Sequence, residues 1–307
     1  MRILELFCGI GGVAEAVWGQ PSLGRVVQAV DIDRQAALVY AANHPLRPTI
    51  ATIESAASWR TRIAGWTADT WWLSPPCQPY CARGRQAPDD ARRDALLQVI
   101  RMVAARPDWL PCRIALENVP AFEQSDDCSR LLSSLDAAGY QTNQQTLCPT
   151  QWGIPNRRQR FYLTAWRSTC KPPTIVPPPR PAAIPLARYL DRDHAADLFL
   201  DPGLQQKFAP GLDIVSPHGT DRPTSCFTAG YGKSIKQAGS YLAVAGRLRR
   251  FSHREVQRLL GYRDAFAWPS RYTHRQRWKM LGNSLSIGVV RQVLASLAVE
   301  NQADIRR

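Results

Sequence analysis

Short apolar runs alternate with stretches of helical periodicity over the first half of the chain. The runs typical of strands are Arg2–Leu6, Arg25–Val30, Thr70–Leu73, Cys112–Leu116 and Arg160–Trp166. Apolar residues recur at helical spacing over Gly11–Trp18, Arg34–Asn43 and Ala91–Ala105. Strands that alternate with helices predict a parallel α/β sheet whose ligand sites lie at the carboxyl ends of the strands.

The pattern changes after residue 170. Lys171–Pro185 contains seven prolines, which predicts a stiff connection rather than a strand inside a sheet. Periodicity stays weak to about Gly246, and helical order returns at the capping box Ser252–Glu255 and over Ser286–Glu300. We therefore expect a large domain of residues 1–170 that is completed by residues 251–307, and a small domain of residues 171–250.

The charge of the chain is its most unusual bulk property. Lysine and arginine number 39 against 25 acidic residues, which leaves a net charge of +14. Such an excess suits a polyanionic partner such as a nucleic acid, because cationic surfaces release counterions from phosphates. A basic surface without such a partner is the alternative.

The cysteines and the apolar runs bear on the cellular setting. The eight cysteines form no CxxC pair and have no histidine at zinc-finger spacing, so no metal site is expected. The start of the chain lacks the features of a signal peptide, and no apolar run is long enough to span a bilayer. We therefore expect a cytoplasmic protein with reduced thiols and no membrane partner.

A glycine-rich turn, Phe7–Gly12, separates the first predicted strand from the first predicted helix. Glycines let the backbone approach a ligand closely, and a helix N-terminus favours an anionic group. Asp31, at the end of the second strand, could accept hydrogen bonds from ribose hydroxyls. Turn and carboxylate together favour a nucleoside-containing cofactor, either a dinucleotide or S-adenosylmethionine, although glycine turns also follow strands that bind nothing.

Cys77 follows two prolines after the strand Thr70–Leu73. The prolines fix the chain as it leaves the strand, which would present the thiol at the carboxyl edge of the sheet. A thiolate is a strong nucleophile once its pKa is lowered. Most cysteines are small buried hydrophobic residues, but the polar Gln78 directly after Cys77 argues against burial here.

Two further segments carry side chains suited to chemistry. Glu117 ends a predicted strand, where its carboxyl could bind or protonate a ring nitrogen as a nucleophile adds; a solvated residue at a strand end is the alternative. Arg158 and Arg160 stand two apart in an extended segment and would point to the same face, where they could grip one phosphate or carbonyl. A solvated basic run is again the alternative.

Taken in order with Gly282–Ser284, these segments resemble the C5-cytosine methyltransferase family over nearly the whole chain. The resemblance implies a Rossmann-like α/β sheet of the S-adenosylmethionine-dependent methyltransferases with helices on both faces, plus a small target-recognition domain. It also implies that one set of residues surrounds the cofactor S-adenosyl-L-methionine. These residues are Phe7, Gly9, Ile10, Gly11, Gly12, Asp31, Ile32, Ile53, Pro75, Asn283 and Ser284.

The resemblance also implies the chemistry. Cys77 would attack C6 of cytosine while Glu117 engages N3, after which C5 takes the methyl group and β-elimination releases Cys77. Arg158 and Arg160 would lie near the cytosine and the nucleophile. Because the enzyme must reach both faces of the base, the target cytosine has to leave its stack.

Several segments are similar to the branch of the family that methylates an anticodon-loop cytosine in aspartate tRNA. They are Gly84–Gln86, Glu117–Glu123, Cys226–Gly232 and Thr52–Glu54, the last standing where most DNA-modifying relatives carry an acidic residue. The residues expected to contact nucleic acid are Gln78, Arg85, Gln86, Cys226, Thr228, Tyr231 and Lys233. The chain departs from the family pattern Pro-Phe-Thr-Arg at Pro79–Ala82, which leaves the role of Cys81 open.

We therefore expect a tRNA cytosine C5 methyltransferase that acts as a monomer, since the splayed bases of an RNA loop are easier to extrude than a paired cytosine. A DNA cytosine C5 methyltransferase of a modification system is the alternative. A non-catalytic nucleic-acid-binding relative is a third possibility, against which the joint presence of Cys77, Glu117, Arg158 and Arg160 argues.

Overall fold

The chain forms two compact units. A computed structural model describes residues 1–52, 68–80, 91–105, 109–167, 174–179, 181–193, 195–218 and 222–298. The first unit comprises residues 1–147, 159–176 and 290–307, and the second comprises residues 148–158 and 177–289. Residues 148–158 and 251–289 therefore have their contacts in the second unit, which differs from the predicted partition. The catalytic and target-recognition roles of the two parts stay predictions.

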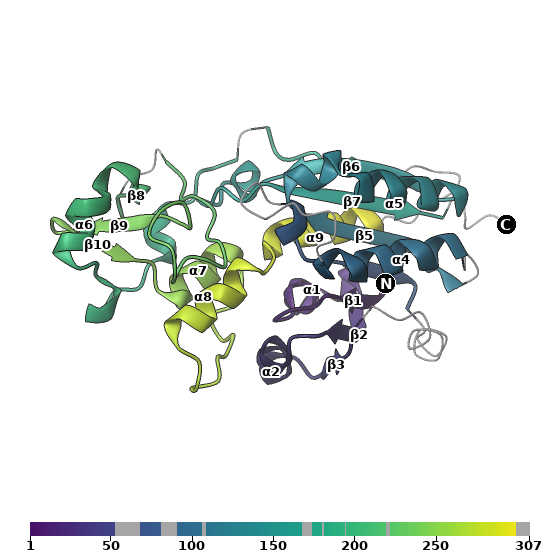
Figure 1. Ribbon diagram of the computed structural model, residues 1–307, viewed down its shortest axis with the longest axis horizontal. Helices are drawn as coiled ribbons and strands as arrows, with labels where there is room; N and C mark the ends of the chain where they lie inside the picture. The colour runs from purple at the N-terminus through teal and green to yellow at the C-terminus, as the bar shows by residue number, and fades with distance from the viewer. Residues whose placement is uncertain are drawn as a thin grey trace. The chain divides into compact units, whose positions relative to one another are not determined.

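The first unit is built on a seven-stranded sheet in the order β3-β2-β1-β4-β5-β7-β6 (Figure 1). Its strands are β1 (Arg2–Leu6), β2 (Arg25–Asp31), β3 (Thr49–Ile50), β4 (Thr70–Leu73), β5 (Arg113–Asn118), β6 (Gln141–Leu147) and β7 (Arg160–Trp166). Strands β1 to β5 pair in parallel. The predicted strands in this unit are confirmed to within two residues at each end.

The predicted parallel sheet has one strand that departs from the parallel direction. Strand β7 pairs antiparallel with both β5 and β6. The chain leaves β5 through helix α5, forms β6 at the sheet edge, and returns without a crossover helix, so β7 lies antiparallel between β5 and β6. Strand β6 has the sequence QTNQQTL, whose polar residues carry no strand signal, and it was not predicted.

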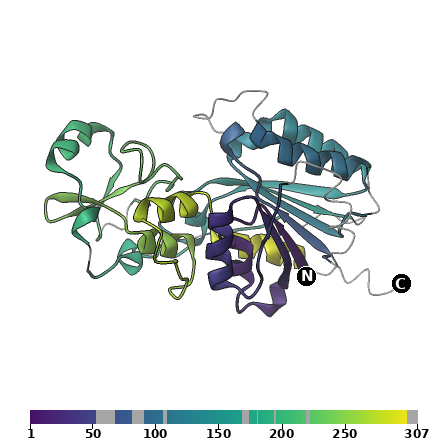
Figure 2. The same ribbon diagram turned by 60° about the horizontal axis from the view of Figure 1, so that its bottom comes forward.

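Helices cover both faces of this sheet, as expected. They are α1 (Gly12–Val17), α2 (Arg34–Asn43), α4 (Asp94–Ala105), α5 (Asp126–Ala137) and α9 (Ile287–Ala298). Figure 2 shows α4 and α5 on one face and α1 and α9 on the other. Arg291 of α9 donates from Nε to the carbonyl of Ala16, which fastens α9 to α1 at 2.9 Å.

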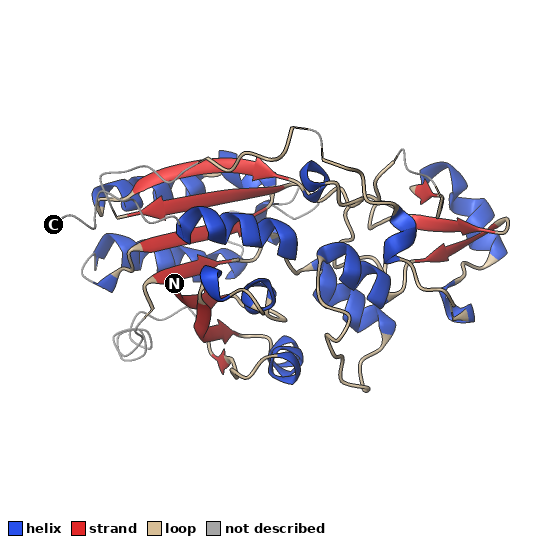
Figure 3. Cartoon of the chain, turned by 180° about the vertical axis from the view of Figure 1, so that it is seen from behind, coloured by secondary structure: helices blue, strands red, loops and turns tan. Residues whose placement is uncertain are grey.

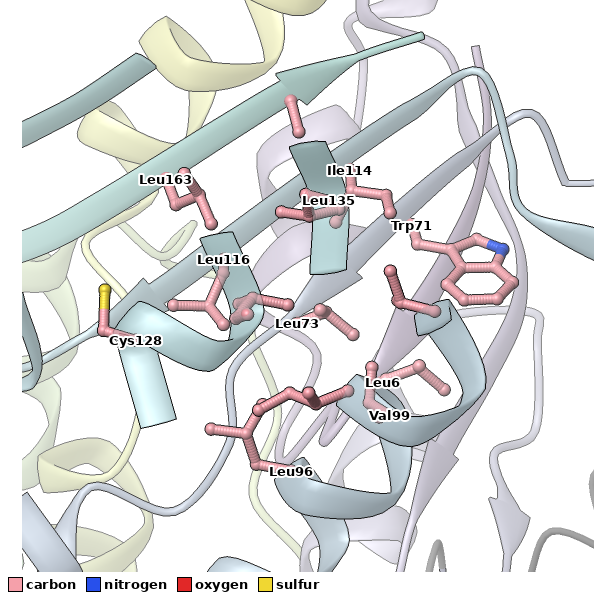
Figure 4. Packing of buried hydrophobic residues seen from close by; sticks show 14 of the residues in the cluster. Leu6, Trp71, Leu73, Leu96, Val99, Ile114, Leu116, Cys128, Leu135 and Leu163 are labelled. Carbon is pink, nitrogen blue, oxygen red and sulfur yellow. The ribbon is translucent and has the colours of Figure 1, made fainter. Parts of the chain in front are cut away.

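The main core of the first unit lies between the sheet and helices α4 and α5 (Figure 4). Leu96 and Val99 of α4 are each 1 % exposed and pack in the same cluster as Leu73 and Leu116 of the sheet. Each side chain of this kind contributes about 1.5–3 kcal/mol when it leaves water. This packing holds the carboxyl ends of β4 and β5 in a fixed frame.

The second unit contains a small sheet in the order β10-β9-β8 and, among its described residues, the α-helices named below (Figure 3). Its elements are β8 (Ile214–Val215), β9 (Tyr241–Val244), β10 (Arg247–Arg250), α6 (Pro202–Phe208), α7 (His253–Leu260) and α8 (His274–Gly282). The predicted capping box is confirmed, since Ser252 and Glu255 exchange side-chain-to-backbone hydrogen bonds of 3.1 and 2.7 Å. Within the described ranges, no helix combines the length and the apolar character needed to span a bilayer.

Candidate functional site

The glycine turn between β1 and α1 is held against the end of β2. Asp31 accepts a hydrogen bond from the backbone N–H of Gly9 through Oδ2 and from that of Asp33 through Oδ1, each at 2.7 Å. Burial raises the pKa of Asp31, and these backbone hydrogen bonds offset only part of the rise. Each carboxylate oxygen keeps further acceptor capacity, so Asp31 can still bind a hydroxyl.

The space around this turn suits a nucleoside. A side chain on Gly9 would meet nothing within 4 Å, so the backbone there is open. Ile32, directly after β2, is 62 % exposed and offers an apolar surface to a flat ring. Phe7 has a left-handed φ of 58°, a strained conformation for an aromatic residue that tends to occur where ligands bind.

Glu5 lies beneath the turn and was not identified from the sequence. Its side chain is 1 % exposed and accepts hydrogen bonds from the N–H of Val13 at 2.9 Å and from the hydroxyl of Tyr40 at 3.3 Å. Burial raises the pKa of Glu5 from 4.5 to about 8. An acidic residue inside the apolar strand Arg2–Leu6 was the signal available in the sequence.

The segment that carries Cys77 is fixed at the carboxyl ends of neighbouring strands, as predicted. Ser74 donates its N–H to the carbonyl of Leu6 at 3.3 Å. Asn118, the last residue of β5, donates from Nδ2 to the carbonyl of Pro75 at 3.4 Å. The half-buried Cys77 then begins a tight turn, because its carbonyl accepts the N–H of Tyr80 at 3.0 Å.

Gln78 stands directly after Cys77 in the 3-10 turn η2 (Gln78–Tyr80). Its Oε1 atom is buried and accepts no hydrogen bond within the part of the chain that the structure describes. A buried acceptor without a donor is costly, so a ligand that supplies an N–H or O–H there would be favoured. This suits the predicted contact of Gln78 with the nucleic acid, which stays a prediction.

Glu117 and Arg160 form an ion pair at the same edge of the sheet. Arg160 Nε lies 3.1 Å from Glu117 Oε1, and their side chains are 15 % and 10 % exposed. In the pairing of β4 with β5, Leu73 lies beside Leu116. The segment that leads to Cys77 starts directly after Leu73, and Glu117 directly follows Leu116, so both begin at the same edge of the sheet. The structure thus places three predicted groups on adjacent strands.

Arg158 behaves differently from the prediction. It is 3 % exposed, and its guanidinium donates to the carbonyls of Phe227 at 3.3 Å, Gly282 at 3.2 Å and Ser284. All of these partners lie in the second unit, whereas Arg160 lies in the first. The terminal nitrogens of Arg158 are thus bonded to backbone carbonyls, while its buried Nε has no hydrogen-bond partner among the described residues. The predicted grip of both arginines on one phosphate or carbonyl stays a prediction.

The segment Cys226–Gly232 is packed tightly against helix α8. A side chain on Gly282 would lie 2.2 Å from backbone atoms of Thr228 and Ala229, so only glycine allows this approach. Cys226 Sγ lies 3.5 Å from Arg158 NH1. Arg158 and Gly282 together hold the predicted recognition segment, Cys226–Gly232, against residues Gly282–Ser284.

The predicted nucleic-acid contacts in this region divide into buried and exposed residues. Tyr231 is 1 % exposed, donates its hydroxyl to the carbonyl of Ser240 at 2.7 Å and accepts the N–H of Phe251 at 2.9 Å. Its side chain belongs to the core of the second unit, so only its backbone could reach a nucleic acid, and the predicted contact stays a prediction. Lys233 is exposed, and Thr228 is half-buried.

The remaining predicted site residues are placed as follows. The side chain of Ile10 is 2 % exposed, so only its backbone could reach a ligand. Asn283 is exposed at the end of α8, and Ser284 is 8 % exposed with its hydroxyl bonded to Tyr262. Gly12 is the first residue of α1. Ile53, Cys81, Arg85 and Gln86 lie outside the described residues.

Comparison with known proteins places this geometry in context. The family model described as C-5 cytosine-specific DNA methylase matches residues 1–196 and 210–298. A tRNA (cytosine(38)-C(5))-methyltransferase of Bos taurus is 28 % identical over 97 % of this chain and 99 % of its own. The solved structure of the Entamoeba histolytica methyltransferase EhMeth has a TM-score of 0.87 at 25 % identity, covering 100 % of this chain and 99 % of its own. The Schizosaccharomyces pombe Dnmt2 methyltransferase has a TM-score of 0.84 at 27 % identity and covers 100 % of both chains.

Proposed function

Because the chain belongs to the C-5 cytosine-specific DNA methylase family, we propose that it methylates carbon 5 of an anticodon-loop cytosine in aspartate tRNA. The proposal is supported by the segment that leads to Cys77, the carboxyl group of Glu117 and the guanidinium of Arg160, which all lie at one edge of the sheet. Asn118 ties the segment that leads to Cys77 to the end of β5, where Glu117 pairs with Arg160. We further expect the enzyme to act as a monomer in the cytoplasm.

The residues around the glycine turn fit S-adenosyl-L-methionine, which supplies the methyl group when bound. Open backbone at Gly9, a carboxylate at Asp31 with acceptor capacity left over, and the exposed apolar side chain of Ile32 match the methionine, ribose and adenine parts of such a molecule. Glu5 supports the turn from below by binding the N–H of Val13. Asn283 and Ser284 stay predicted contacts.

The chemistry assigned to the chain uses Cys77 as the nucleophile. Cytosine C5 is a poor nucleophile until a thiolate adds at C6, which turns the ring into an enamine-like system with electron density on C5. A new Sγ–C6 bond forms in this step, and the bond breaks again when a proton leaves C5 after methylation and the C5–C6 double bond returns. Cys77 is regenerated.

Glu117 holds N3 of the ring while this addition occurs. The Arg160 guanidinium lies 3.1 Å from Oε1 of that carboxyl group and holds it at the edge of the sheet. A side chain held by such a pair loses little conformational freedom when the base arrives. Arg158 is buried among backbone carbonyls and holds the recognition segment through them. Its predicted place near the cytosine stays a prediction.

A nucleic-acid substrate is supported by where the positive charge lies. Residues 222–289 contain thirteen of the lysines and arginines but only two acidic residues, Glu255 and Asp264. Glu255 is buried in an ion pair with Arg249 at 2.7 Å, and Asp264 pairs with Arg258 at 2.8 Å. The exposed cations in this range include Lys233, Arg254, Arg275 and Lys279. A basic region of this density suits a phosphate backbone.

The substrate can be tested with one labelling experiment. The enzyme is incubated with labelled S-adenosylmethionine and a mixture of total tRNA and genomic DNA, and the labelled cytosine is then mapped. We expect the label in the anticodon loop of aspartate tRNA. Label in one DNA sequence motif and none in tRNA would overturn the tRNA assignment in favour of a DNA methyltransferase of a modification system.

The nucleophile can be tested separately with Cys77→Ala. This variant should lose methyl transfer by about 10³-fold or more, because it removes the thiol that adds to C6. Binding of S-adenosylmethionine, measured by calorimetry, should stay within about twofold, since the glycine turn is untouched. Cys112→Ala, which removes an exposed thiol outside the predicted site, serves as the control. Transfer that survives in Cys77→Ala would contradict the covalent mechanism.

A further inference from the structure

A buried carboxylate outside the proposed site binds side chains from two turns next to it. Asp127, in the first turn of α5, is 0 % exposed. Its Oδ2 accepts hydrogen bonds from the hydroxyl of Tyr80 at 2.7 Å and from Nε of Arg93 at 2.8 Å. Its Oδ1 accepts a hydrogen bond from Nη2 of Arg93 at 2.7 Å. Arg93 thus binds both oxygens, which is the strongest geometry available to this pair of groups.

The two partners of Asp127 stand on either side of residues 81–90, which lie outside the described residues. Tyr80 ends the turn η2 that begins directly after Cys77, and its N–H donates to the Cys77 carbonyl at 3.0 Å. Arg93 ends the 3-10 turn η3 (Ala91–Arg93) that leads into α4. The carboxylate of Asp127 therefore holds the chain before this segment through Tyr80 and after it through Arg93. Tyr80 is three residues from the nucleophile.

The protonation states favour this arrangement. Burial would raise the pKa of Asp127, but the hydrogen bonds from Arg93 and Tyr80 outweigh burial and hold the pKa below its ordinary value. Burial and the neighbouring carboxylate raise the pKa of Tyr80, so the phenol keeps its proton and donates it. Asp127 is consequently an ionised acceptor over the whole neutral range.

The ring of Tyr80 has a separate anchor from its hydroxyl. It packs edge-on against Phe122 with ring centroids 4.9 Å apart, and Phe122 is 0 % exposed and also contacts Phe161. A phenylalanine in place of Tyr80 would keep these ring contacts.

We propose that Asp127 is a positioning residue for Cys77 and acts through the Tyr80 hydroxyl, which locks the turn that begins at the nucleophile. This inference rests on the proposed function in one respect, namely that Cys77 is the nucleophile. A turn anchored only by the ring of Tyr80 could pivot about that ring, whereas a second anchor on the hydroxyl removes this freedom. A shift of about 1 Å at a reacting atom is enough to cost about 10²-fold in rate.

The test compares Tyr80→Phe with Tyr140→Phe. Tyr140 is also buried and its hydroxyl donates to the carbonyl of Pro111, so its variant matches the loss of one buried hydroxyl away from Cys77. The first measurement is the rate at which iodoacetamide alkylates Cys77 in the free enzyme, followed by mass spectrometry of the Cys77 peptide. We expect alkylation in Tyr80→Phe to rise by about threefold or more, because a turn that has lost its anchor exposes the thiol more often.

The second measurement is single-turnover methyl transfer at saturating tRNA and cofactor. Tyr80→Phe should slow this step by about tenfold, with the KM for tRNA and the affinity for S-adenosylmethionine within about twofold of the parent. Asp127→Asn should act in the same direction, and the double variant should lose less than the sum of the two single losses. Tyr140→Phe should change neither the alkylation rate nor the single-turnover rate.

Equal alkylation and equal single-turnover rates in Tyr80→Phe and Tyr140→Phe would overturn the proposal, even if Asp127→Asn fails to fold. The alkylation measurement needs no substrate. If Cys77→Ala retained methyl transfer, the proposed function would fall, while faster alkylation in Tyr80→Phe would still show that the hydroxyl positions this thiol. The two failures are therefore distinguishable.

Discussion

The guanidinium of Arg160 lies 3.1 Å from the carboxylate of Glu117 because β7 runs antiparallel to β5. Glu117 faces Tyr162 across this pair of strands, and Arg160 precedes Tyr162 by two residues, so both charged side chains lie on one face of the sheet. The register therefore sets an arginine diagonally opposite the carboxyl group that would receive the cytosine ring. A parallel β7 would have carried this arginine to the opposite end of the strand.

Arg160→Gln and Glu117→Gln should each lower kcat/KM for tRNA by about 10²-fold or more, because each removes one member of the pair that binds the ring. The losses should not add in the double variant, since the two side chains work as one unit. Steady-state methyl transfer to tRNA measures both effects. Arg157→Gln, which changes an exposed neighbouring arginine, is the control, and fully additive losses would contradict the pairing.

Arg158→Lys should destabilise the protein rather than alter the chemical step directly. A lysine ammonium cannot span the carbonyls of Phe227, Gly282 and Ser284 at once, and buried carbonyls left without donors cost about 2–4 kcal/mol together. Urea unfolding followed by fluorescence measures this loss. The matched change Arg160→Lys should affect stability less and kcat/KM more. If the Arg158→Lys variant were as stable as the parent but lacked methyl transfer, Arg158 would have a direct role in the reaction.

The stability of the protein should depend on pH through Glu5. The pKa of Glu5 is about 8 in the folded protein against 4.5 as its ordinary value, so an unfolded chain loses this proton at lower pH than the folded one. The contribution of Glu5 is then fully present below pH 4.5 and declines as pH rises through 8. The decline is about 1.4 kcal/mol per pH unit between these limits.

Glu5→Gln removes this titration and keeps a carbonyl oxygen for the N–H of Val13. Urea unfolding at pH 5, 6, 7 and 8 should therefore show the variant gaining stability relative to the parent as pH rises. The exposed Glu123→Gln provides the control and should track the parent at every pH. A parent and a Glu5→Gln variant with parallel pH profiles would show that Glu5 titrates in its ordinary range.

The salt dependence of tRNA binding should report the exposed cations of the second unit. Replacing Arg275 and Lys279 of α8 by glutamine should make the plot of log affinity against log salt shallower by about 1.4, because each lost phosphate contact removes about 0.7 from the slope on single-stranded RNA. Fluorescence anisotropy at several KCl concentrations measures the slope. Replacing Arg25 and Arg101, which are exposed on the first unit, is the matched control. Equal slopes in both double variants would place the RNA elsewhere.

The local sequence determined most of the strands and the positions of the chemical groups along them. Runs such as Arg2–Leu6 and Thr70–Leu73 carry their own periodicity, and two prolines before Cys77 fix the chain where it leaves β4. Because parallel strands end at a common edge, Cys77 and Glu117 could be assigned to that edge without coordinates. The polar strand Gln141–Leu147 could not be found, since its side chains show no apolar alternation and its place at the sheet edge requires none.

Only the tertiary structure decided which of these groups meet. Arg158 and Arg160 are two residues apart, which predicts that their side chains lie on one face of an extended segment. In the structure, Arg158 donates to carbonyls of the second unit, whereas Arg160 pairs with Glu117. Packing also buries the side chain of Tyr231. It brings the hydroxyl of Tyr80 within hydrogen-bond distance of Asp127, which is 47 residues away in the chain. Periodicity reports which face of an element is apolar, whereas partners across the chain depend on strand direction and on the burial of polar groups that must be satisfied. Those are properties of the assembled fold.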